Sequence, residues 1–255
     1  MRRPLLAHGR MRWKVHVGAA VGPGGVVGRH TASFRFESSV ATWYSDLQRT
    51  DETTGRESAM TAPALPLEDH VSTALAVLRR GGVIALPTDT VYGLAALPGH
   101  SGGMRRLWRL SGRPPGTGVP LLLAGPEHLP RVVAAVPPPA RRLMRRFWPG
   151  PLTLLLRAAP RLRGDAFALA DVVAVRVPDT TGLRTLIEQA GGVLAVITAD
   201  PAQGSARADL VLPGPPPTGV TSSIVDCSRE PPRLVREGVL ARSVLERAAG
   251  CTLTR

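Results

Sequence analysis

Several polar residues that follow an apolar run could bind a small ligand. The run is residues 83–86, and the polar residues after it are Thr88, Asp89, Thr90 and Tyr92. Hydroxyl groups donate and accept hydrogen bonds, and a carboxylate accepts them. A buried strand that ends in a polar binding loop explains this order of residues. An ordinary turn closed by an Asx-type hydrogen bond from Asp89 explains it as well.

The elements that would position these residues alternate along the chain. Short apolar runs predict strands at residues 83–86, 121–124, 152–156, 172–177, 193–197, 223–226 and 233–235. Amphipathic stretches predict helices at residues 67–80, 104–110, 127–136, 139–147, 183–190 and 241–249. Proline and glycine predict loops at residues 111–121 and 213–217. The alternation implies an α/β or α+β domain with a mixed sheet.

The composition permits a folded enzyme with polyanionic ligands. The chain has 255 residues, 44% of them hydrophobic, which suits one large domain or two small ones. Its formal charge is +13, and Lys14 is the only lysine among 32 basic residues. Arginine favours bidentate contacts with phosphate and carboxylate groups, so nucleotides or RNA are expected partners. Solvated surface arginine explains the same excess.

Cysteine content and hydropathy suggest a cytoplasmic protein without a membrane span. Cys227 and Cys251 are too few for a disulfide framework and lack a metal-binding spacing, which fits a reducing cytoplasm. No apolar run approaches the roughly 18 residues that cross a bilayer.

The first 59 residues differ from the rest of the chain. Seven basic residues and no acidic residue precede Glu37. A transit peptide, a disordered basic arm or an untranslated upstream extension would each explain this bias. We favour the extension, because Met60 offers a plausible start. The expected organisation is a basic leader at residues 1–59 and one domain at residues 60–255.

Six motifs occur in one order along this domain. They are P-T-D-T-V-Y-G-L at 87–94, G-R-P at 112–114, W-P-G-P-L-T-L at 148–154, V-A-V-R-V-P-D at 173–179, S-S-I-V-D at 222–226 and L-V-R-E-G at 234–238. Together they resemble the YrdC-like family of threonylcarbamoyl-AMP synthases, over about residues 67–245. The resemblance implies an open, twisted mixed sheet with flanking helices.

The same resemblance implies a nucleotidyltransferase. Such an enzyme makes threonylcarbamoyl-adenylate and pyrophosphate from L-threonine, bicarbonate and ATP, with Mg²⁺ expected. The product serves the threonylcarbamoyladenosine modification of tRNA. The implied partners are therefore tRNA or double-stranded RNA and the proteins that transfer the threonylcarbamoyl group to tRNA.

This reaction requires positioning and charge neutralisation rather than a protein nucleophile. Threonine's amine captures bicarbonate as a carbamate, whose oxygen attacks the α-phosphorus of ATP. No residue is assigned as catalytic. The resemblance implies a threonine site made of Thr88, Thr90, Tyr92, Arg176, Thr180 and Ser222, in which Arg176 would bind the carboxylate. It implies an ATP site made of Ser111, Arg113, Thr198, Asp200 and Arg236.

The sequence departs from the family's motifs at three of these positions. Ser111 replaces the lysine of a K-x-R motif, Asp200 replaces the asparagine of an S-x-N motif, and Thr180 replaces a histidine. In one interpretation Asp200 holds Mg²⁺ and neighbouring arginines restore the missing charge. The candidates are Arg105, Arg106, Arg109 and Arg207. In the other interpretation the pocket no longer performs the family reaction.

Two other functions stay open. The first is an RNA-binding module without catalysis, which would use Arg105, Arg106, Arg109, Arg113, Arg141, Arg142, Arg145 and Arg146. The second is a related carbamoyl-adenylate enzyme with another acceptor.

Overall fold

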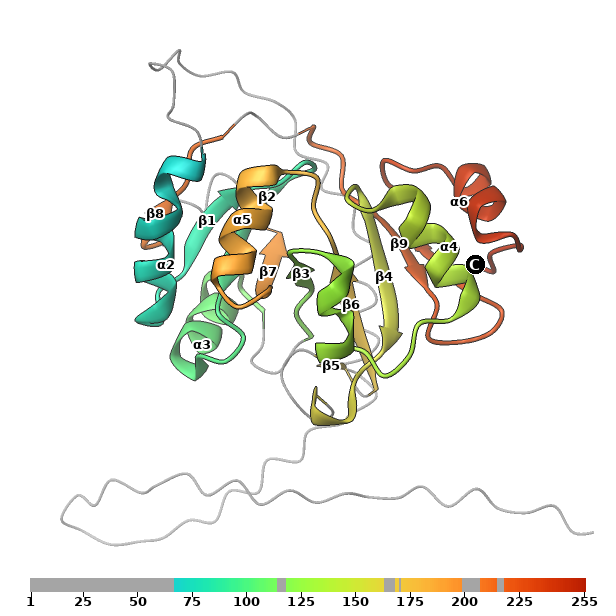
Figure 1. Cartoon of the computed structure of the whole chain (residues 1–255), viewed down its shortest axis with the longest axis horizontal. Helices are drawn as coiled ribbons and strands as arrows, with labels where there is room; N and C mark the ends of the chain where they lie inside the picture. The colour runs from blue at the N-terminus through green and yellow to red at the C-terminus, as the bar shows by residue number, and fades with distance from the viewer. Residues whose placement is uncertain (1–66, 114–117, 163–167, 170, 199–206, 215–217) are drawn as a thin grey trace, which may run out of the picture. The chain divides into compact units, whose positions relative to one another are not determined.

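The computed structural model describes residues 67–113, 118–162, 168–169, 171–198, 207–214 and 218–255 (Figure 1). The predicted leader at residues 1–59, the proposed start at Met60 and the predicted site residue Asp200 lie outside these ranges.

The described strands form one sheet of ten strands, open at both ends and twisted (Figure 1). In spatial order they are β10 (Arg233–Arg236), β9 (Ser223–Asp226), β4 (Leu152–Arg157), β6 (Val172–Arg176), β3 (Leu121–Leu123), β7 (Val193–Thr198), β2 (Tyr92–Ala96), β1 (Ile84–Pro87) and β8 (Leu210–Val211), with β5 (Ala168–Leu169) on β6. Pairs β1–β8, β3–β6 and β4–β9 are parallel, and the other pairs are antiparallel. The predicted mixed, open sheet with flanking helices is confirmed.

Helices cover both faces of this sheet. Consecutive residues of β7 alternate between two hydrophobic clusters: Leu194 and Val196 belong to one, and Ala195 and Ile197 to the other. The first cluster also contains buried residues of η1 (Leu67–His70), α2 (Val71–Arg79) and α5 (Thr181–Gln189). The second contains residues of α3 (Ser101–Leu110), α4 (Pro138–Phe147) and α6 (Arg242–Ala249). Strands buried on both faces need apolar residues at every position, which explains the unbroken apolar runs.

Local signals place the ends of these helices. His100 precedes α3, and its Nδ1 accepts a hydrogen bond from the backbone N–H of Gly103 (3.2 Å). Pro138 opens α4, where its missing N–H costs nothing. Gly250 ends α6 in the left-handed conformation (φ 66°) that glycine adopts without strain. The guanidinium of Arg142 on α4 donates to the carbonyl of Ala249 (2.7 Å), so α4 holds the end of α6.

The structure corrects two predictions about secondary structure. Tyr92 and Gly93 were expected in a loop but begin β2, which forms an antiparallel hairpin with β1. The helix expected at residues 127–136 is only the short 3₁₀ segment η2 (Pro126–Arg131). Pro130 lies inside that segment and lacks the N–H that a longer helix would need. The short strands β5 and β8 were not predicted.

No helix in the described ranges is long and apolar enough to cross a membrane.

Candidate active site

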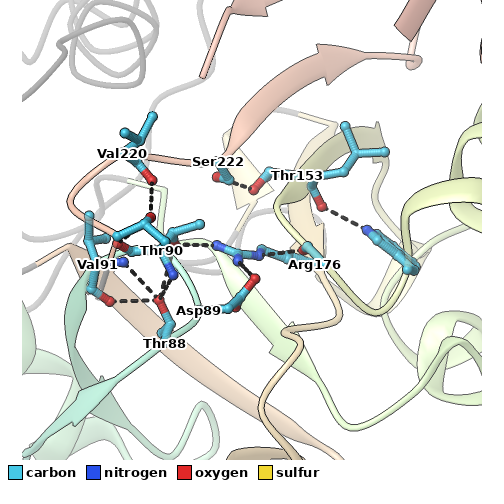
Figure 2. Close-up of polar contacts among 12 residues, drawn as sticks. Thr88, Asp89, Thr90, Val91, Thr153, Arg176, Val220 and Ser222 are labelled. Carbon is cyan, nitrogen blue, oxygen red and sulfur yellow. Dashed lines mark hydrogen bonds and ion pairs between the residues drawn. The ribbon is translucent and has the colours of Figure 1, made fainter. Parts of the chain in front are cut away.

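A tight turn between β1 and β2 carries the first group of predicted site residues. The Thr88 hydroxyl oxygen accepts hydrogen bonds from the backbone N–H groups of Thr90 (3.2 Å) and Val91 (3.1 Å). It also donates to the carbonyl of Val91 (2.6 Å). The turn is therefore closed by a threonine hydroxyl, and the Asx-type closure by Asp89 is wrong. Asp89 instead faces Arg176 (Figure 2).

Arg176 is the centre of the candidate site. It is the last residue of β6, is only 6% exposed, and reaches the turn from 86 positions further along the chain. Its Nη1 donates to the Thr90 hydroxyl (2.8 Å), and its Nη2 pairs with Asp89 Oδ2 (2.6 Å). Its Nε donates to the carbonyl of Gly150 (2.9 Å). These three bonds fix the plane of the guanidinium group (Figure 2).

The charge of Arg176 is held in a buried environment. Burial lowers the pKa of Arg176, and the charge and hydrogen bond of Asp89 oppose that shift. Arginine keeps its proton even under such desolvation because its reference pKa is so high. A buried, oriented cation next to a single carboxylate is thus available to a ligand carboxylate.

The turn that supplies the Gly150 carbonyl is fixed on two sides. Trp148 Nε1 donates to the carbonyl of Leu152 (2.7 Å), and the Gly150 N–H donates to the carbonyl of Val177 (2.9 Å). The W-P-G-P segment therefore forms a fixed turn. This turn orients Arg176 through Gly150.

A second group of predicted site residues surrounds Ser222. Ser222 directly precedes β9 and is buried, and its hydroxyl lies 2.9 Å from the hydroxyl of Thr153 on β4. Arg236, at the end of β10, donates through Nε (3.0 Å) and Nη2 (2.9 Å) to the Ser222 carbonyl. Arg236 is thus held beside the residue predicted to touch threonine.

Backbone contacts join the two groups. The Thr90 carbonyl accepts hydrogen bonds from the N–H of Gly219 (3.0 Å) and the hydroxyl of Thr218 (3.4 Å), both in the segment that leads to Ser222. Figure 2 shows the Thr88–Val91 turn, Arg176 and the Thr153–Ser222 pair in one region. The structure therefore brings together Thr88, Thr90, Arg176, Ser222 and Arg236.

The remaining predicted threonine-site residues, Tyr92 and Thr180, and the predicted ATP-site residue Thr198 occupy strand and helix ends. Tyr92 is half-buried at the start of β2, where burial raises its pKa. Thr198 is exposed at the end of β7 and lies opposite Gly93 in the ladder, at the same end of the sheet. Thr180 precedes α5 and makes no side-chain cap of that helix. No hydrogen bond among the described residues links Thr180 to Arg176.

The predicted ATP site is only partly visible in the described ranges. Ser111 ends α3: its N–H donates to the carbonyl of Leu107 (3.0 Å), and its hydroxyl donates to the carbonyl of Trp108 (3.0 Å). Arg113 is half-buried, and its N–H also donates to the Trp108 carbonyl (3.1 Å). Ser111 thus stabilises a helix end and supplies no cation where the family has lysine.

One of the arginines expected to replace that lysine points elsewhere. Arg106 pairs with Asp209 (2.8 Å), whose other carboxylate oxygen accepts the Val83 N–H (2.8 Å). Val83 lies before β1, at the end opposite the Thr88 turn. Arg106 is therefore an incorrect candidate, whereas Arg105, Arg109 and Arg207 are exposed and stay candidates.

The sequence reading missed Thr153 as a site residue and did not recognise Asp89 as the partner of Arg176. Thr153 is the one polar residue in the buried stretch 152–156, and a polar group in such a run needs a partner. The sequence therefore contained a signal that Thr153 has a polar partner. The Asp89 pairing depends on strand order, which local sequence does not reveal.

A cavity of about 580 Å³ lies away from this site. Its lining includes Leu97, which follows β2, and Val193, which begins β7, so it opens at the end of the sheet opposite Tyr92 and Thr198. Its charged lining residues Arg131 and Arg161 donate to backbone carbonyls. None of the predicted site residues lines it.

Two of the four arginines on α4 form hydrogen bonds with backbone carbonyls. Arg141 donates to the Val136 carbonyl (2.9 Å), and Arg142 donates to Ala249. Arg145 and Arg146 are exposed. Among the described residues, Arg145 and Arg146 make no hydrogen bond or ion pair, so two of these four arginines stay available to the predicted RNA-binding patch.

Comparison with known proteins agrees with the motifs and the fold. A protein-family model named for Sua5, YciO and YrdC, and described as telomere recombination, matches residues 76–238. The chain belongs to this family. The family predicted from the six motifs is thus confirmed.

Members of the Sua5/YciO/YrdC family with assigned names are similar to this chain over much of its length. Threonylcarbamoyl-AMP synthase of Bacillus subtilis is 31% identical over 198 residues, which cover 72% of this chain and 57% of that protein. The synthase of Thiobacillus denitrificans is 39% identical over 125 residues, which cover 49% of this chain and 66% of that protein. The chain therefore spans less than two thirds of the length of these two relatives.

Solved structures of the family share the fold. Pyrococcus abyssi Sua5 in complex with L-threonine aligns with a TM-score of 0.66 at 29% identity, covering 74% of this chain and 59% of that one. Escherichia coli YciO aligns with a TM-score of 0.61 at 25% identity, covering 72% of this chain and 96% of that one.

Proposed function

We propose that this chain is a threonylcarbamoyl-AMP synthase. It would convert L-threonine, bicarbonate and ATP into threonylcarbamoyl-adenylate, pyrophosphate and water. The observation that carries the proposal is the buried Arg176 at the end of β6, which is held by Thr90, Asp89 and Gly150. The solved complex of Pyrococcus abyssi Sua5 with L-threonine supports an amino-acid ligand.

The bonds of Arg176 leave capacity for a carboxylate. A guanidinium has five N–H groups, and the described residues accept from one on each of its three nitrogens. One N–H on Nη1 and one on Nη2 have no acceptor among those residues. Two adjacent N–H groups match the two oxygens of a carboxylate. Arg176 would therefore bind threonine's carboxylate without breaking its contacts to the fold.

The reaction needs orientation more than it needs a protein acid or base. With its carboxylate held, threonine's carbamate oxygen must approach the α-phosphorus in line with the departing pyrophosphate. Arg236, fixed on the Ser222 carbonyl, would neutralise phosphate charge next to the amino acid. Arg113 would do so from the end of α3. Holding both substrates in this geometry is the main contribution we assign to the protein.

The departure at Ser111 weakens this site without removing it. The missing lysine takes one fixed positive charge from the triphosphate, and one lost contact of this kind costs about 2 kcal/mol. That corresponds to roughly a thirtyfold loss of affinity. We therefore propose a retained activity with weaker ATP binding. The Mg²⁺ ligand role of Asp200 stays a prediction.

The partners beyond the substrates are also predictions. From the proposed activity we predict that the product serves tRNA modification and passes to the proteins that transfer the threonylcarbamoyl group to tRNA. We also predict contact with tRNA or double-stranded RNA and a cytoplasmic location. The second class of function, RNA binding without catalysis, has weaker support because Arg141 and Arg142 serve local structure.

Pyrophosphate release tests the proposed activity. Purified protein is incubated with ATP, bicarbonate and L-threonine, and each substrate is omitted in turn. Release that requires all three, with threonylcarbamoyl-adenylate detected by mass spectrometry, supports the proposal. Release no greater than in the threonine-free sample overturns it. Release supported by another amino acid, but not by threonine, would favour the related enzyme with a different acceptor.

Two strand-end arginines provide a matched comparison. Arg176→Lys keeps a positive charge but loses the planar fork, so threonine-dependent release should fall at least tenfold. Arg157→Lys changes an exposed arginine at the end of β4 and should leave the release unchanged. Equal effects of the two changes would count against the assignment of Arg176.

A further inference from the structure

Asp89 contains a buried carboxylate oxygen that the fold does not satisfy. Its Oδ2 pairs with Arg176, but its Oδ1 is buried and has no hydrogen-bond partner among the described residues. A carboxylate oxygen without a partner is costly in a buried position, because it has lost water and gained nothing in exchange. The side chain as a whole is 16% exposed, so the carboxylate lies at the edge of the region that solvent reaches.

The Asp89–Arg176 pair has the charge pattern that complements an amino-acid zwitterion. The two side chains place a negative and a positive group 2.6 Å apart. In an α-amino acid the ammonium and the carboxylate are attached to one carbon, so their charges are similarly close. Arg176 has two N–H groups left for the carboxylate, and Asp89 has one oxygen left for the ammonium. Binding of the zwitterion would satisfy both.

We propose that Asp89 is a binding residue that holds the α-ammonium group of the amino-acid substrate, while Arg176 holds its carboxylate. This inference rests on the proposed threonine-binding function. It assigns a role to Asp89, which the sequence motifs did not place in the threonine site. It makes Asp89 a determinant of specificity for α-amino acids over hydroxy acids of the same shape.

A purely structural role for Asp89 makes a different prediction. If Asp89 only orients Arg176, its loss weakens every ligand that uses Arg176, with or without an amine. If Asp89 also contacts the ammonium, its loss selectively weakens ligands that carry one. Comparing two ligands in two proteins separates these cases.

The ligands are L-threonine and (R)-3-hydroxybutyrate, which is threonine without its amine. Their affinities are measured by calorimetry, without ATP, for the wild-type chain and for Asp89→Asn. In the wild type we expect removal of the amine to weaken binding about 10- to 100-fold, the range for a hydrogen bond to a charged group. In Asp89→Asn we expect the two ligands to differ by less than about threefold.

Asp209→Asn is the matched control. Asp209 also pairs with an arginine, Arg106 at 2.8 Å, but at the opposite end of β1. This variant should show the wild-type difference between the two ligands. The same amine-dependent difference in Asp89→Asn and in the wild type overturns the proposal.

The wild type alone also decides the matter if Asp89→Asn does not fold. Equal binding of the two ligands to the wild type means that no group holds the ammonium, which overturns the proposal. Pyrophosphate release, measured on the same preparations, separates this result from failure of the proposed function. If pyrophosphate is released but the two ligands bind equally well, only the role of Asp89 is contradicted. If threonine binds more tightly than its amine-free analogue but no pyrophosphate is released, only the synthase activity is contradicted.

Discussion

The hydroxyl oxygens of Thr153 and Ser222 lie 2.9 Å apart, although 69 positions separate the two residues in the chain. Thr153 belongs to β4, and Ser222 leads into the parallel strand β9. In such a pair the hydroxyl that donates keeps two acceptor lone pairs, and the hydroxyl that accepts keeps its O–H donor and one lone pair. Figure 2 shows this pair in the same region as Arg176, and Arg236 donates hydrogen bonds to Ser222.

Ser222→Ala should reduce activity more than stability. The change removes one hydroxyl and leaves Thr153 without this partner, which costs about 1 kcal/mol in the free energy of unfolding. The loss of a substrate contact should lower threonine-dependent pyrophosphate release at least tenfold. Release and urea unfolding are measured on the same sample.

The neighbouring serine is the control for this change. The Ser223 hydroxyl donates to the Leu240 carbonyl (2.8 Å) and accepts from the N–H groups of Gly238 (3.0 Å) and Leu240 (2.9 Å). Ser223→Ala should therefore lower the free energy of unfolding by about 2 kcal/mol, because it leaves three partly buried backbone groups without this partner. Its activity should persist wherever the variant is folded. The assignment fails if the two serines exchange these effects.

Ser111→Lys should strengthen ATP binding. The added cation lies where the family has its lysine, and we expect the KM for ATP to fall about tenfold at low salt. Losing the hydrogen bond from the Ser111 hydroxyl to the Trp108 carbonyl should cost little stability, and a lysine is favourable in the last turn of a helix. Pyrophosphate release at varied ATP concentration provides the measurement.

Ser101→Lys introduces the same charge at the other end of α3. It should leave the KM for ATP within twofold of the wild type. A KM that is unchanged in Ser111→Lys would show that the charge at this position does not reach the triphosphate.

Gly93→Ala should destabilise the β1–β2 hairpin by about 1–3 kcal/mol, the usual cost of overpacking. A β-carbon at Gly93 would lie 2.5 Å from Cγ1 of Val196 on the adjacent strand β7. Adding Val196→Ala removes that methyl group and should recover more than half of the loss. A double-mutant cycle of unfolding free energies tests this, and additive effects would contradict the steric explanation.

Cys227 should make stability fall with rising pH. Burial, helped by the nearby Asp226 and Cys251, raises the pKa of its thiol from 9.0 to about 12. Between these values the unfolded chain loses the proton and the folded chain keeps it. The contribution is complete below pH 9 and declines by up to about 1.4 kcal/mol per pH unit as pH rises toward 12.

Cys227→Ala removes this pH-dependent contribution to the free energy of unfolding. At pH 8 the variant should be less stable than the wild type, because it loses a buried side chain. At pH 10 the difference should be about 1 kcal/mol smaller. Urea unfolding at both values tests the prediction, and a constant difference would contradict it.

Long, regular segments were predictable from the sequence, and the elements that depend on their neighbours were not. The apolar stretch of β4 and the helix α4 were predicted to within a residue or two. Strand β2, with the sequence Y-G-L-A-A, has little intrinsic preference for extended structure. It forms a strand because β1 and β7 pair with it on both sides.

The residues of the candidate site also divide into those that the sequence predicts and those that depend on contacts between strands. Thr88, Thr90, Arg176 and Ser222 were predicted because their motifs are local, and the fold brings all four to one region. The partners that complete the site come from other strands. Asp89 was seen as a turn residue and Thr153 as a core residue, because their roles depend on contacts with Arg176 and Ser222.

The contacts inside the Thr88–Val91 turn and the contact from Arg176 to this turn differ in sequence separation, and therefore in when they form during folding. The Thr88–Val91 turn closes between residues three positions apart, whereas the bond from Arg176 to Thr90 spans 86 positions. Local contacts of the first kind form quickly, and contacts of the second kind wait until β6 has been incorporated in the sheet. The proposed affinity for the amino acid would therefore appear only late in folding. On a ribosome, a nascent chain that ends before β6 would hold the complete turn and still be unable to retain threonine.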